Sequence, residues 1–396
     1  MGSFFINSTD SQLLRSSMLI LVFSIIIILT LSYGLLILLL YLGLFFLKSG
    51  KNNFQYFVSV VVAARNEAKN IHSCLEALVN QSYPSDQYEI IIVNDRSGDE
   101  TATIVESYGK QYSQVKLVQV KDLPQGISPK KHALAKGIDA AEGEIILTTD
   151  ADCVPAAGWI QGMVRNFEPE VGLVAGFSPL EKNVKETIFS KLLTLDSLSL
   201  AAVAAGSFGL GKPLTCNGRN LGYRKATFQS INGFKSIQNL ISGDDDLLLH
   251  LVSQKTDWKI RYSINCQTLV RSKIPTNFKQ FANQRIRHAS KGRHYSKWIK
   301  LFLVGVYLVN LILLIMLPVS FFISNIFLIW LLCWLIKSSS EFLLINRFAK
   351  LFNYRKILTV FPVAMLLHLP YVVVFGLWGY VGKFQWKEDI FKAEVD

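Results

Sequence analysis

The sequence has few charged residues and lacks the short motifs of several common enzyme classes. Charged residues make up 18% of the 396 residues, whereas soluble domains contain about 25%. The five cysteines are an odd number without a C-x-x-C spacing, which favours free thiols in a reducing compartment over a disulfide-rich secreted module. H-E-x-x-H, G-x-S-x-G and a G-x-G-x-x-G after a strand-like run are also lacking, so zinc-protease, serine-hydrolase and dinucleotide-binding chemistry have no support.

Three long apolar blocks account for the low charge. Residues 18–47 form a run of 30 residues without a charge, which is long enough to cross the roughly 30 Å core of a bilayer. Residues 301–336 suit either a tight hairpin of two spans or one long span, and residues 357–381 form a third block. The sequence therefore predicts an integral membrane protein with three or four spans.

Basic residues beside the apolar blocks indicate how the protein is oriented. Lys48 and Lys51 follow the first block, and Arg347, Lys350 and Arg355 lie between the last two. The positive-inside rule then places the intervening domain on the cytoplasmic side, and we expect a bacterial inner membrane. We attribute the net charge of +12 to these loops and to an anionic substrate rather than to nucleic acid, because no nucleic-acid-binding motif accompanies it.

The apolar pattern divides the chain into four parts. We predict an N-terminal transmembrane anchor over residues 1–48 and a cytoplasmic enzyme domain over residues 49–277. A basic stretch with interspersed aromatic residues, 278–300, has the composition of a helix lying on the membrane surface. Residues 301–396 form a C-terminal transmembrane region with two or three spans.

The middle part reads as alternating strands and helices. Residues 58–63, 89–94 and 144–149 are continuous apolar runs, which suit strands buried on both faces of a parallel sheet. Helical spacing follows over residues 71–79 and 133–141. We read the order as strand, helix, strand, helix, helix, strand, which predicts a doubly wound α/β sheet.

Polar residues end each predicted strand, and ligands bind beyond the carboxyl ends of strands in such sheets. Asp150 and Asp152 follow the third strand around one small residue. Two carboxylates at this spacing can reach one hard divalent cation, and Mg²⁺ or Mn²⁺ is usually shared with substrate phosphates. The pattern predicts a metal site that holds a diphosphate.

A run of three acids, Asp244, Asp245 and Asp246, stands before an apolar helical segment. Such a run is often only a solvated helix start favoured by the dipole. Crowded carboxylates near a cleft also raise one another's pKa, which suits a general base. The basic stretch 279–300 can in turn supply a cationic clamp for a departing diphosphate.

Taken together, these segments resemble the family 2 glycosyltransferases, which are inverting enzymes with a GT-A fold. The resemblance covers residues 57–298 and the flanking membrane segments, and the matching segments occur in the family's order. They are Val60 to Glu67 (P-x-x-N-E, with Ala63 for Pro), Val93 to Asp99 (D-D-x-S-x-D, with Asn94 for the first Asp), Lys130 to Leu134 (K-x-x-A-L), Asp150 to Asp152 (D-x-D), Cys216 to Arg224 (G-x-N-x-A-Y-R), Gly243 to Asp245 (G-E-D) and Gln284 to His288 (Q-x-x-R-W, with His288 for Trp).

The resemblance implies a role for each matching residue. Asp152, with Asp150, would hold Mg²⁺ or Mn²⁺, and Asp245, with Asp244 beside it, would be the catalytic base. Asp95 would bind the nucleotide base and Glu67 the ribose. The residues expected at the nucleotide sugar are Ala64, Arg65, Glu67, Asp95, Lys131, Asp150, Ala151, Gln284 and Arg287, and those expected at the acceptor are Asn217 and Arg219.

The expected reaction moves a sugar from a nucleotide-diphosphate sugar, most often a UDP-sugar in this family, to a hydroxyl of a lipid or glycan. A phosphate acceptor would need no base, so the presence of Asp245 favours a hydroxyl. A processive polysaccharide synthase is the alternative, although three or four spans offer little material for a polymer channel. An inactive nucleotide-sugar-binding module is a further alternative, and it would be expected to have lost the D-x-D or the base.

Overall fold

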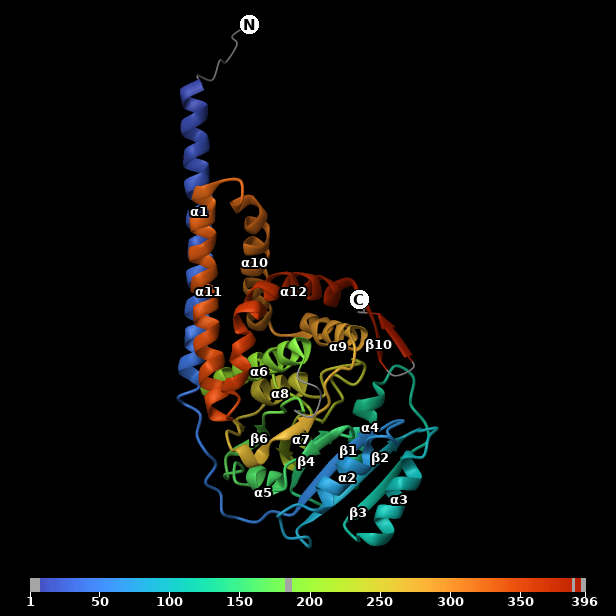
Figure 1. The fold of residues 1–396 in the computed structure, drawn as a ribbon. Helices are drawn as coiled ribbons and strands as arrows, with labels where there is room; N and C mark the ends of the chain where they lie inside the picture. The colour runs from blue at the N-terminus through green and yellow to red at the C-terminus, as the bar shows by residue number, and fades with distance from the viewer. Residues whose placement is uncertain (1–7, 182–186, 387–388, 393–396) are drawn as a thin grey trace.

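The computed structural model describes residues 8–181, 187–386 and 389–392. A sheet domain forms one end of the molecule, and long helices rise from it (Figure 1). The ends of the predicted terminal regions, residues 1–7 and 393–396, lie outside the described residues. The five cysteines are all described, and all are free thiols as expected.

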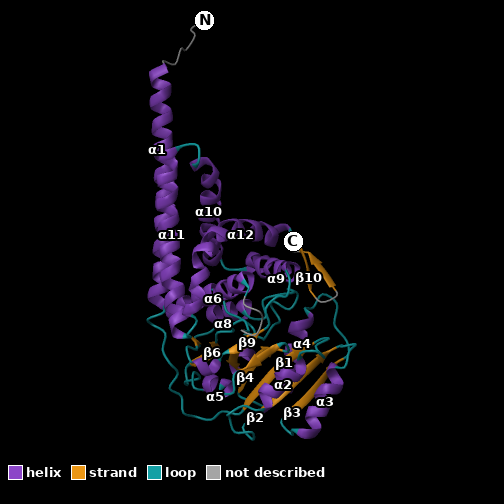
Figure 2. Ribbon diagram, viewed as in Figure 1, coloured by secondary structure: helices purple, strands orange, loops and turns teal. Residues whose placement is uncertain are grey.

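A seven-stranded mixed sheet organises the domain (Figure 2). Its first four strands in spatial order are parallel, β7 is antiparallel to both of its neighbours, and β6 and β8 are parallel. The spatial order is β3 (Val115–Val120), β2 (Tyr88–Asp95), β1 (Val58–Ala64), β4 (Ile145–Asp150), β7 (Leu221–Arg224), β6 (Val171–Ala175) and β8 (Lys259–Tyr262). Two small antiparallel sheets pair β5 (Cys153–Pro155) with β9 (Val270–Ser272), and β10 (Lys383–Trp386) with β11 (Asp389–Lys392).

Both faces of the sheet are buried, because successive side chains of a strand point in opposite directions. Val60 and Val62 of β1 join one apolar cluster, whereas Val61 joins the other. The first cluster includes buried residues of α2 (Ile71–Val79), α3 (Thr101–Gln111) and α5 (Trp159–Val164). The second includes residues of α4 (Pro129–Ala140), α7 (Lys225–Ser230) and α8 (Asp246–Lys255), and it continues into the long apolar helices that rise from the domain.

β1, β2 and β4 lie where the sequence predicts strands, whereas β3 was not predicted. Lys116 of β3 is exposed and Leu117 and Val118 are only half-buried, since β3 is an edge strand. An edge strand lacks the continuous apolar run that identifies a strand buried on both faces. The short strands β5 to β9 were missed as well, because a run of three to five residues carries little periodicity.

Five helices in the described part of the chain are long and apolar enough to cross a membrane, whereas the sequence predicts three or four spans. The 301–336 block is a hairpin, with a turn before Ser324. The additional helix is α6, which packs against α1, α11 and β8; burial on several sides accounts for its apolar composition. The five are α1 (Ser8–Gly43), α6 (Ile188–Gly209), α10 (Lys297–Ser320), α11 (Ser324–Leu351) and α12 (Phe361–Val381) with the 3₁₀ turn η3 (Arg355–Val360) before it.

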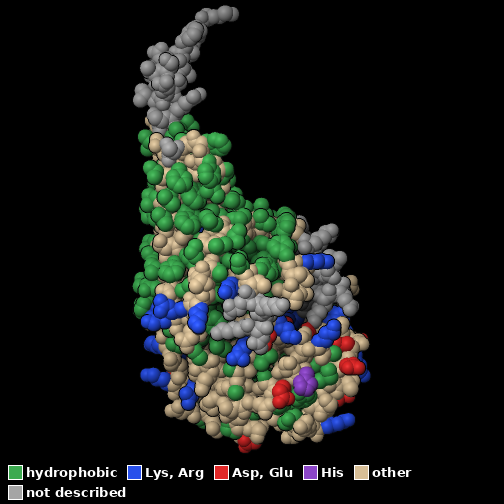
Figure 3. Space-filling view, in the orientation of Figure 1, with side chains coloured by type: hydrophobic (Ala, Val, Ile, Leu, Met, Phe, Trp, Pro, Cys, Tyr) green, Lys and Arg blue, Asp and Glu red, His purple; other side chains and the backbone are tan. Residues whose placement is uncertain are grey.

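Apolar side chains cover the rising helices, and Lys and Arg side chains gather where these helices meet the domain (Figure 3). The predicted surface helix 278–300 is divided in the structure. It consists of α9 (Phe278–Ser290), the 3₁₀ turn η2 (Lys291–His294) and the start of α10. Figure 1 shows α12 lying across the domain above α9, and the two helices are in contact.

A close crossing of α1 and α6 joins the membrane helices to the domain. Gly43 ends α1, and Gly206 and Gly209 lie in the last turn of α6. A Cβ atom at Gly206 would lie 2.4 Å from the carbonyl oxygen of Leu40, and one at Gly209 would lie 1.8 Å from that of Gly43. The crossing therefore requires glycine, in the manner of small-residue helix contacts in membranes.

We predict that Gly206→Ala lowers the thermal stability of the detergent-purified protein, because overpacking costs about 1–3 kcal/mol. Gly305→Ala is the matched control, since Gly305 lies in α10 and a Cβ there meets nothing within 4 Å. The control should be as stable as the wild type or slightly more stable, because alanine favours a helix over glycine by about 1 kcal/mol. Equal melting temperatures for the two variants would contradict the close crossing.

Candidate active site

The loops after β1 and β2 are held together at the carboxyl end of the sheet. Asn66 and Arg96 have positive φ angles, of 52° and 53°, so both loops turn sharply. The Asn66 N–H donates to Ser97 Oγ at 3.0 Å, and Asn66 Oδ1 accepts the Gly98 N–H at 2.9 Å. The Ala68 N–H donates to Asp99 at 2.9 Å. These bonds make one rigid rim from two loops.

Asp95 and Glu67 lie on this rim, where the sequence predicts the nucleoside. Asp95 is buried and accepts a 2.8 Å hydrogen bond from Arg96 Nε. Glu67 accepts a 2.6 Å bond from the Asn70 side chain. Ala64 is buried at the end of β1, and Arg65 follows it.

Asp150 and Asp152 form the acidic centre of the site, with buried Ala151 between them. Their carboxylate oxygens and the Cys153 sulfur lie within 4.8 Å of one another. Burial, followed by the charges of Asp150 and Glu67, raises the pKa of Asp152. Two crowded carboxylates with unfavourable charge repulsion are a suitable oxygen donor set for Mg²⁺ or Mn²⁺.

Cys153 does not fit that donor set. Burial, followed by the charges of Asp152 and Asp150, raises the pKa of its thiol well above the ordinary value, so it stays protonated. Its sulfur lies 3.5 Å from Asp152 Oδ1 as a hydrogen-bond donor. A neutral thiol is a poor ligand for a hard cation, and the two aspartates are the ligands that fit.

Lys130 joins the D-x-D carboxylates to the second acidic cluster, which is the run of three acids at the start of α8. Its Nζ lies 2.8 Å from Asp150 Oδ1 and 2.8 Å from Asp244 Oδ2. Burial acts to raise the pKa of Asp150, but the positive charges of Lys130, Arg219 and Arg287 together lower it. The D-x-D therefore lies within electrostatic reach of the predicted acceptor and leaving-group residues.

Asp245 caps the N-terminus of α8 and is held from three directions. Its Oδ1 accepts the Asp246 N–H at 2.8 Å and lies 3.1 Å from Lys291 Nζ. Its Oδ2 accepts the Gly218 N–H at 3.1 Å. Gly218 belongs to the segment predicted to lie at the acceptor, so the structure brings the predicted base and that segment together.

The expected increase in pKa occurs at Asp246 and not at Asp245. Burial opposes the charge on Asp245, but Lys291 and the hydrogen bonds from Asp246 hold its pKa well below the ordinary value. Burial raises the pKa of Asp246 to about 7, against the opposing effect of Lys291. Asp245 is consequently ionised at neutral pH, as a base must be.

Lys131, predicted to contact the nucleotide sugar, is buried beside the loop that leads to the α8 acids. It is 1% exposed, and its Nζ donates to the carbonyl oxygens of Leu240 and Ser242. It thus fixes the loop that leads to Asp244. Along α4 it is Lys130, one position earlier, that reaches the acidic centre.

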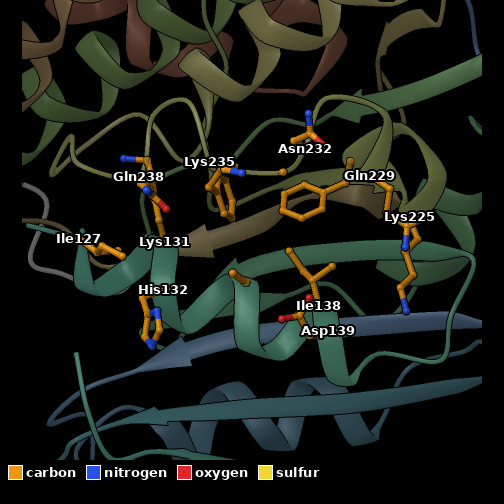
Figure 4. A pocket seen from close by; sticks show the side chains of 14 residues that line it. Ile127, Lys131, His132, Ile138, Asp139, Lys225, Gln229, Asn232, Lys235 and Gln238 are labelled. Atoms are coloured by element: carbon orange, nitrogen blue, oxygen red, sulfur yellow. The ribbon is translucent and has the colours of Figure 1, made fainter. Parts of the chain in front are cut away.

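Lys131 also lines a cavity of about 490 Å³ (Figure 4). Ile138, Lys225, Phe228 and Gln238 are among its lining residues. Among the described residues that line it, neither D-x-D aspartate occurs, nor any of the acids at the start of α8. The cavity is therefore separate from the candidate active site.

The remaining predicted residues lie on two elements beside the acidic centre. Asn217 Oδ1 accepts hydrogen bonds from the backbone N–H and the side-chain Nε–H of Arg219, both at 3.1 Å. Arg219 also donates to Ser272 Oγ. Gln284 and Arg287 both belong to α9. Arg285 of the same helix points away from this group, since it pairs with Asp196 of α6.

Lys130 and Lys291 belong to the candidate site but were not predicted as site residues from the sequence. Two adjacent lysines start the α4 segment, and only the phase of the helix decides which faces the crevice. Lys291 lies four positions after Arg287, which is about one helical turn. That spacing could have singled it out from the other basic residues.

Comparison with known proteins agrees with this geometry. The profile of glycosyl transferase family 2 matches residues 59–227, and that of glycosyl transferase family group 2 matches residues 145–378, more than half of the chain. The chain belongs to the family 2 glycosyltransferases. The matched regions contain β1, the D-x-D, the α8 acids and α9, so the predicted family is confirmed.

Two curated relatives differ in the kind of product that their names give. The β-monoglucosyldiacylglycerol synthase of Trichormus variabilis is 31% identical over 207 residues, 51% of this chain and 42% of that protein. The poly-β-1,6-N-acetyl-D-glucosamine synthase of Staphylococcus epidermidis is 26% identical over 238 residues, 59% of this chain and 54% of that protein. The chain spans about half the length of the curated relatives it matches.

A solved structure shows the same fold. The mannosyltransferase PcManGT from Pyrobaculum calidifontis, solved in complex with GDP-Man and Mn²⁺, aligns with a TM-score of 0.56. The alignment covers 90% of this chain and 99% of that chain at 19% identity. The GT-A-like mixed sheet and the accompanying long helices are thereby confirmed.

We predict that Asp152→Asn weakens the binding of Mn²⁺ more than tenfold, because an amide gives one weaker, uncharged oxygen in place of a carboxylate. Cys153→Ala is the matched control and should leave the affinity within about threefold, since the neutral thiol is not a ligand. The measurement is a titration of Mn²⁺ followed by electron paramagnetic resonance. Weaker binding in Cys153→Ala than in Asp152→Asn would reverse the assignment.

Proposed function

We propose that this protein is a membrane-bound inverting glycosyltransferase that moves a sugar from a nucleotide-diphosphate sugar to a hydroxyl of a lipid at the cytoplasmic membrane surface. A UDP-sugar is the proposed donor. The observation that carries the proposal is the placement of ionised Asp245 against the acceptor segment at Gly218, with Lys130 linking the neighbouring Asp244 to the D-x-D.

The proposed reaction is a single displacement. The acceptor oxygen forms a bond to the anomeric carbon from the face opposite the diphosphate, and the bond from that carbon to the diphosphate oxygen breaks. Asp245 takes the hydroxyl proton, and the electron pair of the broken bond leaves with the nucleoside diphosphate. Because an ionised carboxylate has to be present before transfer, Asp245 is available to take the proton at neutral pH.

The site residues would stabilise the charge that develops on the departing diphosphate. Asp150 and Asp152 would hold Mg²⁺ or Mn²⁺, which supplies positive charge to phosphate oxygens when bound. Arg287 of α9, with Gln284 on the same helix, would contribute further positive charge and hydrogen bonds. Arg219 lies close enough to lower the pKa values of both D-x-D aspartates, so it is suitably placed to act on the same charge.

The position of the site below the membrane helices supports a lipid acceptor. The segment that carries Arg287 leads through η2 directly into α10, and α12 lies over α9. A hydroxyl at the membrane surface would therefore lie close to the base. The β-monoglucosyldiacylglycerol synthase relative is consistent with this class of acceptor.

Polysaccharide synthesis is the second candidate, because one relative is named as a poly-β-1,6-N-acetyl-D-glucosamine synthase. The two candidates differ in the product. Detergent-purified protein would be incubated with a panel of nucleotide sugars, Mg²⁺ or Mn²⁺, and a total lipid extract. Metal- and lipid-dependent release of a nucleoside diphosphate, with the sugar recovered in one lipid, supports the proposal. Release without lipid and a growing glycan product would favour polymer synthesis.

We predict that Asp245→Asn lowers transfer by about 10²–10⁴-fold, since an amide cannot accept the acceptor proton. Binding of the nucleotide sugar in the presence of metal, followed by calorimetry, should remain within a few-fold. Asp257→Asn, at an exposed position after α8, is the matched control and should transfer normally. Parallel losses of binding and turnover in Asp245→Asn would remove Asp245 from the role of base.

A further inference from the structure

A buried lysine lies between two carboxylates at the start of α8. Lys291 is 9% exposed, and its Nζ lies 3.1 Å from Asp245 Oδ1 and 2.8 Å from Asp246 Oδ2. A buried ammonium group is costly unless it is paired, and here it has two acidic partners. The lysine belongs to η2, so this contact joins two elements that are distant in sequence.

The two carboxylates are not equivalent. The Asp246 side chain is fully buried, and it accepts the Leu247 N–H at 2.9 Å and the Tyr295 hydroxyl. The Asp245 side chain retains 17% exposure. Asp246 therefore has no surface from which to meet a substrate, whereas Asp245 does. Lys291 therefore contacts both a buried acid, Asp246, and an accessible one, Asp245.

We propose that Lys291 is a positioning residue for the reaction: it fixes the Asp245 carboxylate, keeps it ionised, and aligns it with Arg287 on the same continuous segment. This inference rests on the proposed base role of Asp245. Because α9 and η2 follow one another without a break, the group that holds the base and the group that steadies the leaving diphosphate would move as one unit.

Several other charged or titratable groups lie near Asp245 and contribute to its pKa. Lys130 lowers the pKa of Asp245, and Asp245 in turn influences the titration of Lys131, Cys216, His250, His288 and Tyr295. Asp244 and Asp246 flank it on the chain. Among the lowering effects on Asp245, that of Lys291 is the largest.

The direction of the pH effect follows from this balance. Without the Lys291 charge, Asp245 and Asp246 face each other with one cation fewer, and the pKa of Asp245 rises. A base must be unprotonated, so the acidic limb of the rate profile moves to higher pH. Because its pKa is raised to about 7, Asp246 is already protonated where Asp245 titrates, so replacing Asp246 with asparagine leaves the limb in place. A purely structural contact of Lys291 predicts no shift in either variant.

The test measures kcat against pH for the full-length protein, with the donor that gives release in the panel and the lipid extract. Lys291→Gln should lower kcat about tenfold or more and move the acidic limb up by roughly one pH unit or more. Lys291→Arg should restore the wild-type limb, and Asp246→Asn should leave it in place. Lys297→Gln, the same change at an exposed position of α10, is the matched control.

An unmoved acidic limb in Lys291→Gln overturns the inference, whatever happens to kcat. If Lys291→Gln does not yield folded protein, the double variant Lys291→Gln/Asp246→Asn decides, because it also removes the buried acid that would lose its partner. An acidic limb of the double variant that stays at the wild-type pH overturns the inference. Failure of the proposed function is distinguishable, because Asp245→Asn would then still transfer sugar. If Asp245→Asn is inactive and the acidic limb of Lys291→Gln stays at the wild-type pH, the role of Lys291 is rejected and the proposed function is not.

Discussion

The neutralisation of buried negative charge determines how this site is built. Asp150, Asp152 and the three acids at the start of α8 lie in one region, and a nucleotide diphosphate would add further negative charge. Such a group of carboxylates is stable only where cations or hydrogen-bond donors offset it. Lys130 offsets Asp150 and Asp244, and Lys291 offsets Asp245 and Asp246. The one acid whose pKa is raised to about 7, Asp246, is the one without exposure.

The two lysines belong to different parts of the molecule. Lys130 belongs to α4, which packs on the sheet, whereas Lys291 belongs to the segment between α9 and α10. The charge balance therefore joins the sheet domain to the membrane helices. Each part supplies cations to the same acidic region. The contacts that attach the sheet domain to the long helices are therefore also contacts that arrange the site.

The parts of the fold that could be predicted are those with a strong local signal. β1, β2 and β4 are continuous apolar runs, and their polar ends identified the D-x-D. β3 was not recognised because an edge strand with Lys116 carries a mixed pattern. α6 was not recognised because Lys191 and Asp196 interrupt its apolar pattern, and its hydropathy is the lowest of the five long apolar helices in the described residues. Side-chain direction was the hardest to predict. The sequence predicted Lys131, and not Lys130, at the site. It also predicted a raised pKa for the acids at the start of α8, because the contact of Lys291 with Asp245 joins residues that are far apart in the sequence.

A second buried ion pair, between Lys337 and Glu341, holds the long apolar helices in their arrangement. The apolar block that starts at residue 301 ends in the sequence at Ile336, but α11 continues through Lys337 and Glu341 to Leu351. Lys337 is fully buried; its Nζ lies 2.8 Å from Glu341 Oε1 and 3.2 Å from His368 Nδ1 of α12.

Glu341 also accepts the Tyr33 hydroxyl of α1, so one ion pair contacts three helices. Polar groups in such an environment are retained where partners satisfy them. Because α12 in turn lies on α9, this pairing fixes the helix that carries Arg287. The position of the proposed leaving-group residue is therefore determined as much by packing among the membrane helices as by the sheet.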